Sequence, residues 1–153
     1  MLSKESLEKI KKTIIDFFKK MTFNVEVEFL PETEETLSVN IKMEDPQILI
    51  GEGGQTLLEI QGLLKAMLRR KTPEIFYIDL DINEYKKKKR EYLKEMARTF
   101  ADEVAITKKE KELAPMPAYE RRIIHLEISK REDVITESSG EGDERKVVIR
   151  PRF

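Results

Sequence analysis

The 153-residue chain lacks cysteine and tryptophan and contains a single histidine, His125. Without cysteine, no disulfide framework, thiolate metal site or cysteine nucleophile can form. With one histidine, a zinc site would need several carboxylates, which is an uncommon arrangement, so we expect no metal ion. We also expect no cofactor and no small-molecule substrate. No apolar run approaches the roughly 18 residues of a membrane span, and no segment looks like a signal peptide. These absences predict a cytoplasmic protein without membrane insertion.

The net charge is only −1, but the charges are unevenly distributed. Residues 1–82 carry 11 basic and 15 acidic side chains, a net of −4, whereas residues 83–153 carry 18 and 15, a net of +3. Much of the basic excess lies in the run 86–90, Lys-Lys-Lys-Lys-Arg. Local patches govern binding to polyanions more than total charge does, so this distribution predicts modest, salt-sensitive affinity.

Hydrophobic periodicity predicts the fold class α+β, with two small domains at residues 1–82 and 83–153. In the first, Ser3 is a suitable N-cap for a helix with apolar residues three and four apart. Alternating strands over 23–29 and 37–43 should form an antiparallel hairpin through the turn-prone segment 31–36. Pro46 opens a short helix, a second helix extends to about residue 71, and a third strand covers 76–82. The predicted order is α-β-β-α-α-β.

The second half predicts the order α-β-α-β-β. A long helix should cover 84–106, with a core stripe of Leu93, Met96, Phe100 and Val104. A short strand or extended lead-in is expected at 113–116, followed by a helix over 118–129. Two strands, 134–138 and 146–150, should be joined by the glycine-containing segment 139–143.

The first candidate binding motif is a G-x-x-G turn between two helical segments. Glycine lets the backbone approach a ligand closely, and the free N–H groups before a helix suit a phosphate oxygen. The alternative is a tight turn without a ligand. A Walker-type loop is excluded because no Gly-Lys-Ser/Thr is present. The candidate RNA-binding residues here are Gly51, Glu52, Gly53, Gly54, Gln55 and Thr56.

With its element order, residues 1–82 resemble a type II KH domain. KH modules clamp the sugar-phosphate of about four nucleotides on such a turn. KH loops usually carry Lys or Arg between the glycines, whereas this chain has Glu52. A carboxylate beside a phosphate is repulsive by roughly 1 kcal/mol at a wet surface. The turn therefore either binds RNA weakly or contacts a protein instead.

The second candidate motif places Arg121 and His125 four residues apart, on one face of a helix. Arg121 can bind a phosphate, while His125 can donate a hydrogen bond or stack on a base. The alternative is a structural histidine beside an arginine in a surface ion pair. Catalysis by His125 would need a nucleophile and an orienting acid, which no motif supplies. The other candidate RNA-binding residues of this half are Arg122 and Arg145, with Lys87, Arg90 and Lys94 on the basic helix.

A longer stretch carries a family resemblance. Residues 114–125 (APMPAYERRIIH), followed by Thr136, the segment 138–141 (SSGE), Arg145 and residues 147–149 (VVI), closely resemble the Arg-x-x-x-His (R-3-H) domain of the bacterial Jag proteins. These are also called SpoIIIJ-associated proteins or KhpB. Residues 50–64 and 81–90 fit the same family, so the resemblance covers nearly the whole chain. It implies a KH domain joined by a basic helix to an R-3-H domain, with a role in cell elongation and envelope homeostasis. It also implies a small stand-alone KH protein as a partner.

The function predicted is non-catalytic binding of single-stranded RNA, or single-stranded DNA, by an RNA chaperone or post-transcriptional regulator. One alternative is a protein-interaction adaptor whose KH fold has lost RNA binding. Another is a nuclease with Asp79, Asp81 and His125 around a metal, although solvent-facing carboxylates that protect a sheet edge explain the two aspartates as well. The long helix also carries a basic stripe at spacings of three and four, formed by Lys87, Arg90, Lys94 and Arg98. The alternative for this stripe is an ion-paired solvated face.

Overall fold

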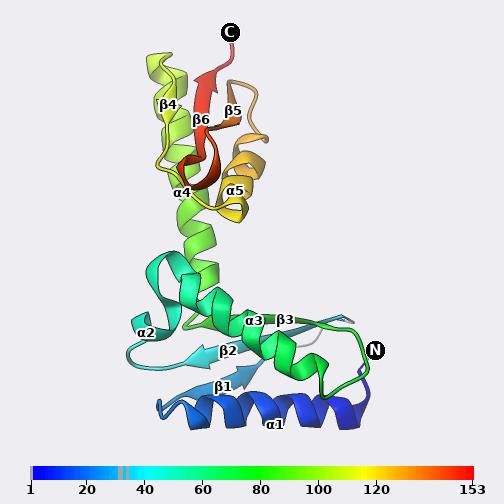
Figure 1. Ribbon diagram of the computed structural model, residues 1–153. Helices are drawn as coiled ribbons and strands as arrows, with labels where there is room; N and C mark the ends of the chain where they lie inside the picture. Colours follow the sequence, from blue (N-terminus) through cyan, green and yellow to red (C-terminus); the bar gives the residue numbers. More distant parts are fainter. Residues whose placement is uncertain (1, 31–32, 34) are drawn as a thin grey trace. The chain divides into compact units, whose positions relative to one another are not determined.

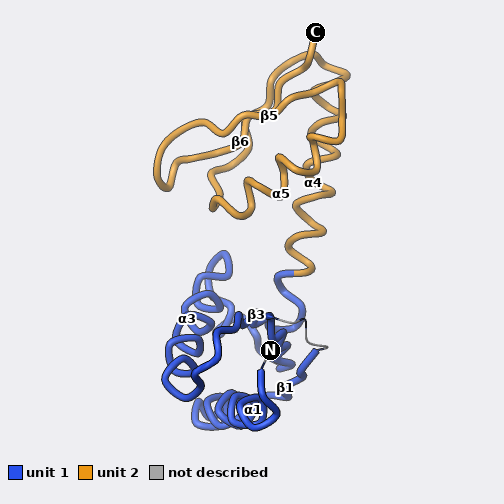
Figure 2. Tube along the Cα trace, turned by 90° about the vertical axis from the view of Figure 1, so that its right-hand side faces the viewer, with its two compact units in different colours: residues 1–86 blue, residues 87–153 orange. Residues whose placement is uncertain are grey.

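The computed structural model describes residues 2–30, 33 and 35–153 (Figure 1). Residues 31, 32 and 34, in the predicted turn, lie outside the described residues. The chain divides into two compact units, residues 1–86 and 87–153 (Figure 2), and each is described by itself. Within the described residues, no helix has the length and apolar content needed to cross a bilayer.

Unit 1 has the predicted order α-β-β-α-α-β, with one turn of 3₁₀ helix between its second and third helices. The first helix begins as expected, because the Ser3 hydroxyl accepts a hydrogen bond from the Ser6 N–H at 3.1 Å. Residues 23–25, predicted as strand, precede the paired segment. The elements are α1 (Lys4–Lys20), β1 (Glu26–Phe29), β2 (Thr36–Lys42), α2 (Gln47–Ile50), η1 (Glu52–Gly54), α3 (Gln55–Arg69) and β3 (Tyr77–Ile82).

The sheet of unit 1 has the order β1-β2-β3. β1 pairs antiparallel with β2, with Val27 opposite Ile41, which confirms the predicted hairpin. β2 pairs parallel with β3, with Val39 opposite Leu80. A parallel pair needs a crossover, which α2, the glycine turn and α3 supply. The turn therefore lies inside the connection between two neighbouring strands.

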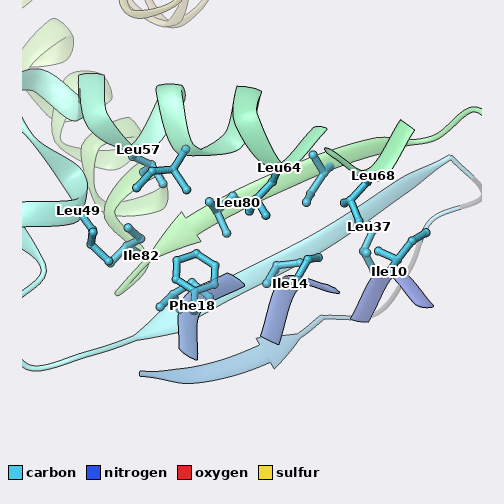
Figure 3. Packing of buried hydrophobic residues seen from close by; sticks show 14 of the residues in the cluster. Ile10, Ile14, Phe18, Leu37, Leu49, Leu57, Leu64, Leu68, Leu80 and Ile82 are labelled. Atoms are coloured by element: carbon cyan, nitrogen blue, oxygen red, sulfur yellow. The ribbon is translucent and has the colours of Figure 1, made fainter. Parts of the chain in front are cut away.

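One face of this sheet is covered by helices. Ile10, Ile14 and Phe18 project from α1 at spacings of four and are fully buried. Leu64 and Leu68 do the same from α3 (Figure 3). Each such side chain stabilises the fold by about 1.5–3 kcal/mol relative to an exposed one. Figure 3 shows the α1 and α3 side chains facing a common core, which fixes the position of the glycine turn at the start of α3.

Unit 2 contains most of the long helix and the elements after it, in the predicted order α-β-α-β-β. The paired strand of this region lies at Lys111–Glu112, just before the predicted segment 113–116. Residues 113–116 are the predicted lead-in: the Leu113 N–H donates to Val147 O at 2.9 Å, and the Met116 N–H donates to Arg145 O at 3.2 Å. The sheet order is β4-β6-β5, antiparallel throughout. The elements are α4 (Tyr85–Thr107), β4 (Lys111–Glu112), α5 (Ala118–Ile128), β5 (Val134–Ser139), η2 (Gly142–Glu144) and β6 (Lys146–Pro151).

The core of unit 2 packs α4 and α5 against this small sheet. Leu93 and Val104 are buried as predicted, but Met96 and Phe100 are only partly buried. Ala97 lies fully buried beside them. Small residues at the centre of the stripe allow neighbouring elements to approach closely. The predicted stripe contained only large apolar residues and did not include Ala97. This packing places one face of α5 over β5.

Candidate nucleic-acid interface

The three glycines of the turn have different structural roles. All have positive φ, at 73° for Gly51, 59° for Gly53 and 82° for Gly54. A Cβ on Gly51 would lie 2.1 Å from Thr56 Oγ1, and one on Gly54 would lie 2.9 Å from Tyr85 Cε1. A Cβ on Gly53 would meet nothing within 4 Å. Gly51 and Gly54 are therefore required by packing, whereas the space over Gly53 is open to a ligand.

The backbone of the turn leaves donors available. The Gly54 N–H donates to Gly51 O at 3.3 Å, and the Gln55 N–H donates to Glu52 O. Neither bond uses the N–H groups of Glu52 or Gly53. No side chain caps the start of α3, so its positive end faces the same region. Open N–H groups at the start of a helix can accept an anion as a hydrogen-bonding partner.

The side chains around the turn add no positive charge that would attract an anion. Glu52 is exposed, and within the described residues it forms no ion pair. The Gln55 side chain is engaged along α3, where its Nε2 donates to Glu59 Oε1 at 3.0 Å. Thr56 is half-buried beneath Gly51. An un-neutralised carboxylate therefore remains beside the open donors.

In unit 2, Arg121 and His125 lie on one face of α5, as the spacing predicted, and both contact the hydroxyl of Ser138 on β5. Arg121 Nη1 donates to Ser138 Oγ at 3.3 Å, and His125 Nε2 lies 2.8 Å from the same oxygen. His125 Nδ1 lies 2.7 Å from Thr136 Oγ1. Arg121 Nε also donates to Met116 O at 3.1 Å. We call Arg121, His125, Thr136 and Ser138 the hydroxyl ladder.

The two hydroxyls can satisfy a neutral His125. Ser138 Oγ accepts from Arg121, and its own hydrogen can donate to His125 Nε2 while Nδ1–H donates to Thr136. Partial burial, and then the positive charge of Arg121, lower the pKa of His125 from its ordinary value. Protonation of His125 in the free protein therefore needs a more acidic pH than protonation of an exposed imidazole.

Arg121 is held in place without being neutralised. Among the described residues no carboxylate forms an ion pair with it, so the surface-ion-pair alternative is wrong for this arginine. Two of its five N–H groups are used by Met116 and Ser138. The side chain borders a pocket of about 280 Å³, which is also lined by Pro117 and Asp143. The remaining donors suit a phosphate.

Arg122 and Arg145 are predicted residues of this half that lie outside the hydroxyl ladder. Arg122 is exposed, and in the part of the chain that the structure describes it has neither a hydrogen bond nor an ion pair. Arg145 Nη1 donates to Gly140 O at 2.8 Å and closes the loop between β5 and β6. Arg145 therefore has a structural contact, while Arg122 presents a free cation.

The predicted basic stripe on α4 is partly ion-paired. Lys94 pairs within α4 at 3.5 Å, and Arg98 Nε lies 2.7 Å from the buried carboxylate of Glu127. Lys87 and Arg90 are exposed and have no partner among the described side chains. The ion-paired interpretation therefore holds for Lys94 and Arg98, whereas Lys87 and Arg90 remain predicted RNA contacts.

The two aspartates of β3 form hydrogen bonds to Lys86 in the first turn of α4. Asp81 Oδ1 accepts the Lys86 N–H at 3.0 Å, and Asp79 Oδ1 lies 2.8 Å from Lys86 Nζ. No group of three His, Asp or Glu side chains in the described ranges could hold a metal ion. The contacts of Asp81 are those of a helix cap, a role that sequence reasoning missed.

Sequence reasoning also did not nominate Thr136 and Ser138 as site residues. A signal was present, because residues two apart on a strand point to the same face. What the sequence could not supply was that this face of β5 lies under α5.

Comparison with known proteins identifies the family of the chain. The model of the Arg-x-x-x-His (R-3-H) domain family matches residues 91–151, which include the whole hydroxyl ladder. A protein of Clostridium symbiosum named "RNA-binding protein KhpB" is 37% identical over 129 residues, covering 84% of this chain and 58% of that protein. The Bacillus subtilis protein of the same name is 37% identical over 120 residues, covering 77% of this chain and 58% of that protein. The chain belongs to the Jag family.

This Jag-family chain spans somewhat more than half the length of the two relatives just described. A third relative, the "RNA-binding protein KhpB" of Lactiplantibacillus plantarum, is 33% identical over 102 residues, which is 67% of this chain and 32% of that protein. The resemblance predicted from residues 114–149 is confirmed.

Proposed function

We propose that this chain is a non-catalytic RNA-binding protein that prefers single-stranded segments and acts as an RNA chaperone or post-transcriptional regulator. RNA is contacted at two sites. One is the glycine turn of a KH-like domain, residues 1–82, and the other is the Arg121–His125 face of an R-3-H domain, residues 83–153. The names of the curated relatives support RNA as the ligand.

The observation that carries the proposal is the state of Arg121 in the hydroxyl ladder. Two hydrogen bonds fix the guanidinium, yet no carboxylate among the described residues neutralises it. A cation that is already held in place loses little conformational entropy when it binds an anion. A phosphate accepting the remaining N–H groups forms a charge-assisted contact. Arg122, one position along, adds a second cation next to it.

Single strands are favoured because both sites suit flexible backbones. A glycine turn of this kind contacts the sugar-phosphate and leaves bases unpaired, and His125 and the apolar wall of the adjoining pocket can receive a splayed base. The contacts proposed at both sites are to phosphates and bases rather than to the 2′-hydroxyl, so single-stranded DNA should bind as well. By family resemblance we assign a cytoplasmic role in cell elongation and envelope homeostasis, alongside a small stand-alone KH protein.

The test compares Arg121→Gln with Arg152→Gln in the full chain, using fluorescence anisotropy with a labelled single strand of about 20 nucleotides. Both substitutions remove one positive charge from unit 2, but Arg152 lies outside the hydroxyl ladder. A charge-assisted hydrogen bond contributes about 1.5–3 kcal/mol, so Arg121→Gln should weaken binding at least tenfold. Arg152→Gln should change affinity only slightly. Equal affinities for the two variants would refute the assignment.

One specific observation favours the adaptor alternative for residues 1–82. Glu52 stands un-neutralised beside the open donors of the turn, in a half of the chain with a net charge of −4. If this domain contacts only protein, Gly53→Asp should leave RNA affinity unchanged while Arg121→Gln still reduces it. A nuclease would be revealed by cleavage of the labelled strand that depends on a divalent metal, and we expect none.

A further inference from the structure

A basic pocket lies in unit 1 at the far end of α3 from the glycine turn. It has a volume of about 420 Å³ and is lined by Lys9, Lys12, Thr13 and Asp16 of α1 and by Lys71, which follows α3. The four α1 residues recur at three- and four-residue intervals, so they share one face of that helix. We call this cavity the lysine pocket.

The ammonium groups of the lysine pocket have spare donors. Lys71 Nζ donates to the hydroxyl of the buried Thr13 at 3.3 Å, and that hydroxyl donates to Lys9 O at 2.8 Å. Lys9 Nζ pairs with the exposed Glu5 at 2.8 Å. Lys12 has no partner within the described part of the chain. Each ammonium has three N–H groups, so most of them remain available.

The charge of the lysine pocket selects an anion. Its lining carries three lysines and one carboxylate, Asp16, which has no ion pair among the described residues. The two arginines immediately before Lys71, Arg69 and Arg70, are exposed and likewise have no partner in the described ranges. Lys9 is paired with Glu5, but Lys12 and Lys71 have no ion pair among the described residues, and a bound polyanion would relieve the repulsion between these like charges.

The position of the pocket indicates which anion binds there. α3 begins at the glycine turn and has 15 residues, so its two ends are separated by about 20 Å. A KH-type turn holds only about four nucleotides, and a longer strand must continue beyond it. The lysine pocket offers that continuing backbone a group of cations within the same unit.

We propose that the lysine pocket is a second phosphate-binding site of unit 1, which takes the backbone of a single strand extending beyond the glycine turn. It contacts phosphates through Lys12 and Lys71 and does not read bases. Asp16 limits its affinity. This inference rests on the proposed function, because it takes RNA as the ligand.

The experiment measures the salt dependence of anisotropy binding for the full chain with a 20-nucleotide single strand. The double variant Lys12→Gln/Lys71→Gln is compared with Lys19→Gln/Lys20→Gln, which removes two exposed lysines from the same helix outside the pocket. Losing two phosphate contacts should lower the slope of log K against log salt by about 1.4 and weaken binding roughly tenfold at low salt. Asp16→Asn should tighten binding. Urea denaturation checks that each variant is folded.

Three outcomes are informative. If the two double variants lower the slope of log K against log salt equally while the wild-type chain still binds RNA, the pocket is refuted as a phosphate site and the proposed function survives. If the wild-type chain does not bind RNA, the proposed function itself fails. If Lys12→Gln/Lys71→Gln binds RNA like the wild-type chain but no longer binds a labelled polyglutamate that the wild-type chain binds, the pocket takes acidic protein segments, and our choice of ligand is wrong.

Discussion

Gly53→Asp is the sharpest single perturbation of the glycine turn, because the site has room for a side chain. A Cβ at Gly53 meets no atom within 4 Å, while φ is 59°, in the left-handed region that Asp and Asn tolerate. The conformational cost is about 1 kcal/mol of folding free energy. Gly51→Ala would be a poor probe, since its Cβ would also lie 2.9 Å from the Thr56 backbone nitrogen and disturb the turn.

Gly53→Asn supplies the matched control. Asn has the shape of Asp and the same backbone preference, so any steric block to RNA is common to both variants. Asp adds one negative charge beside the phosphate. For exposed charges about 4 Å apart in water the repulsion is about 1 kcal/mol, or roughly a fivefold loss of affinity.

The assay is fluorescence anisotropy with a labelled single strand at two salt concentrations, with urea denaturation as the folding check. We expect the order wild type, Gly53→Asn, Gly53→Asp from tightest to weakest, and a smaller Asp–Asn gap at high salt. Both variants should lose a similar amount of stability. Equal RNA affinity for all three chains would show that phosphate does not lie over this turn.

Further substitutions test neighbouring parts of the account. Glu52→Lys should tighten RNA binding and steepen its salt slope by roughly 0.7–1.4, with Glu52→Gln in between; unchanged affinity would mean that Glu52 points away from RNA. Ser138→Ala removes the shared partner of Arg121 and His125, so urea denaturation should show a loss of about 1 kcal/mol, and RNA binding should weaken as Arg121 loses its orientation. Because the pKa of His125 is lower when folded, the unfolded chain takes up its proton first, and stability should fall as pH drops below about 6.5. In His125→Gln that part of the acid dependence should disappear; its persistence would assign it to other groups.

Much of the fold was predictable because its signals are local. The spacing of Ile10, Ile14 and Phe18 defines a helix with one buried stripe before any partner is known. The order of elements in both units followed from such periods. The parallel pairing of β2 with β3 did not, because it depends on how the crossover packs. The start of β1 at Glu26 was also missed, since Phe23 and Val25 keep the alternation but lack a paired strand.

The candidate binding residues also divide into features that local sequence determines and contacts that depend on packing. The glycine turn could be predicted, because a positive φ at Gly51 and Gly54 is a requirement of the local backbone. The spacing of Arg121 and His125 gave a shared face, but not its partners. Ser138 is 13 residues from His125, and only the packing of β5 under α5 brings them together.

The central claim, RNA contact at two sites on one chain, is tested most directly by strand length. Four chains would be titrated at one fixed salt concentration: wild type, Gly53→Asp, Arg121→Gln and the double variant Gly53→Asp/Arg121→Gln. Each is tested against a long single strand and against a strand too short to span both sites. Linked sites act at effective concentrations near millimolar, so wild type should bind the long strand at least tenfold more tightly than the short one. Each single variant should lose much of that advantage, and the double variant nearly all of it. An advantage that survives undiminished in either single variant would contradict the account.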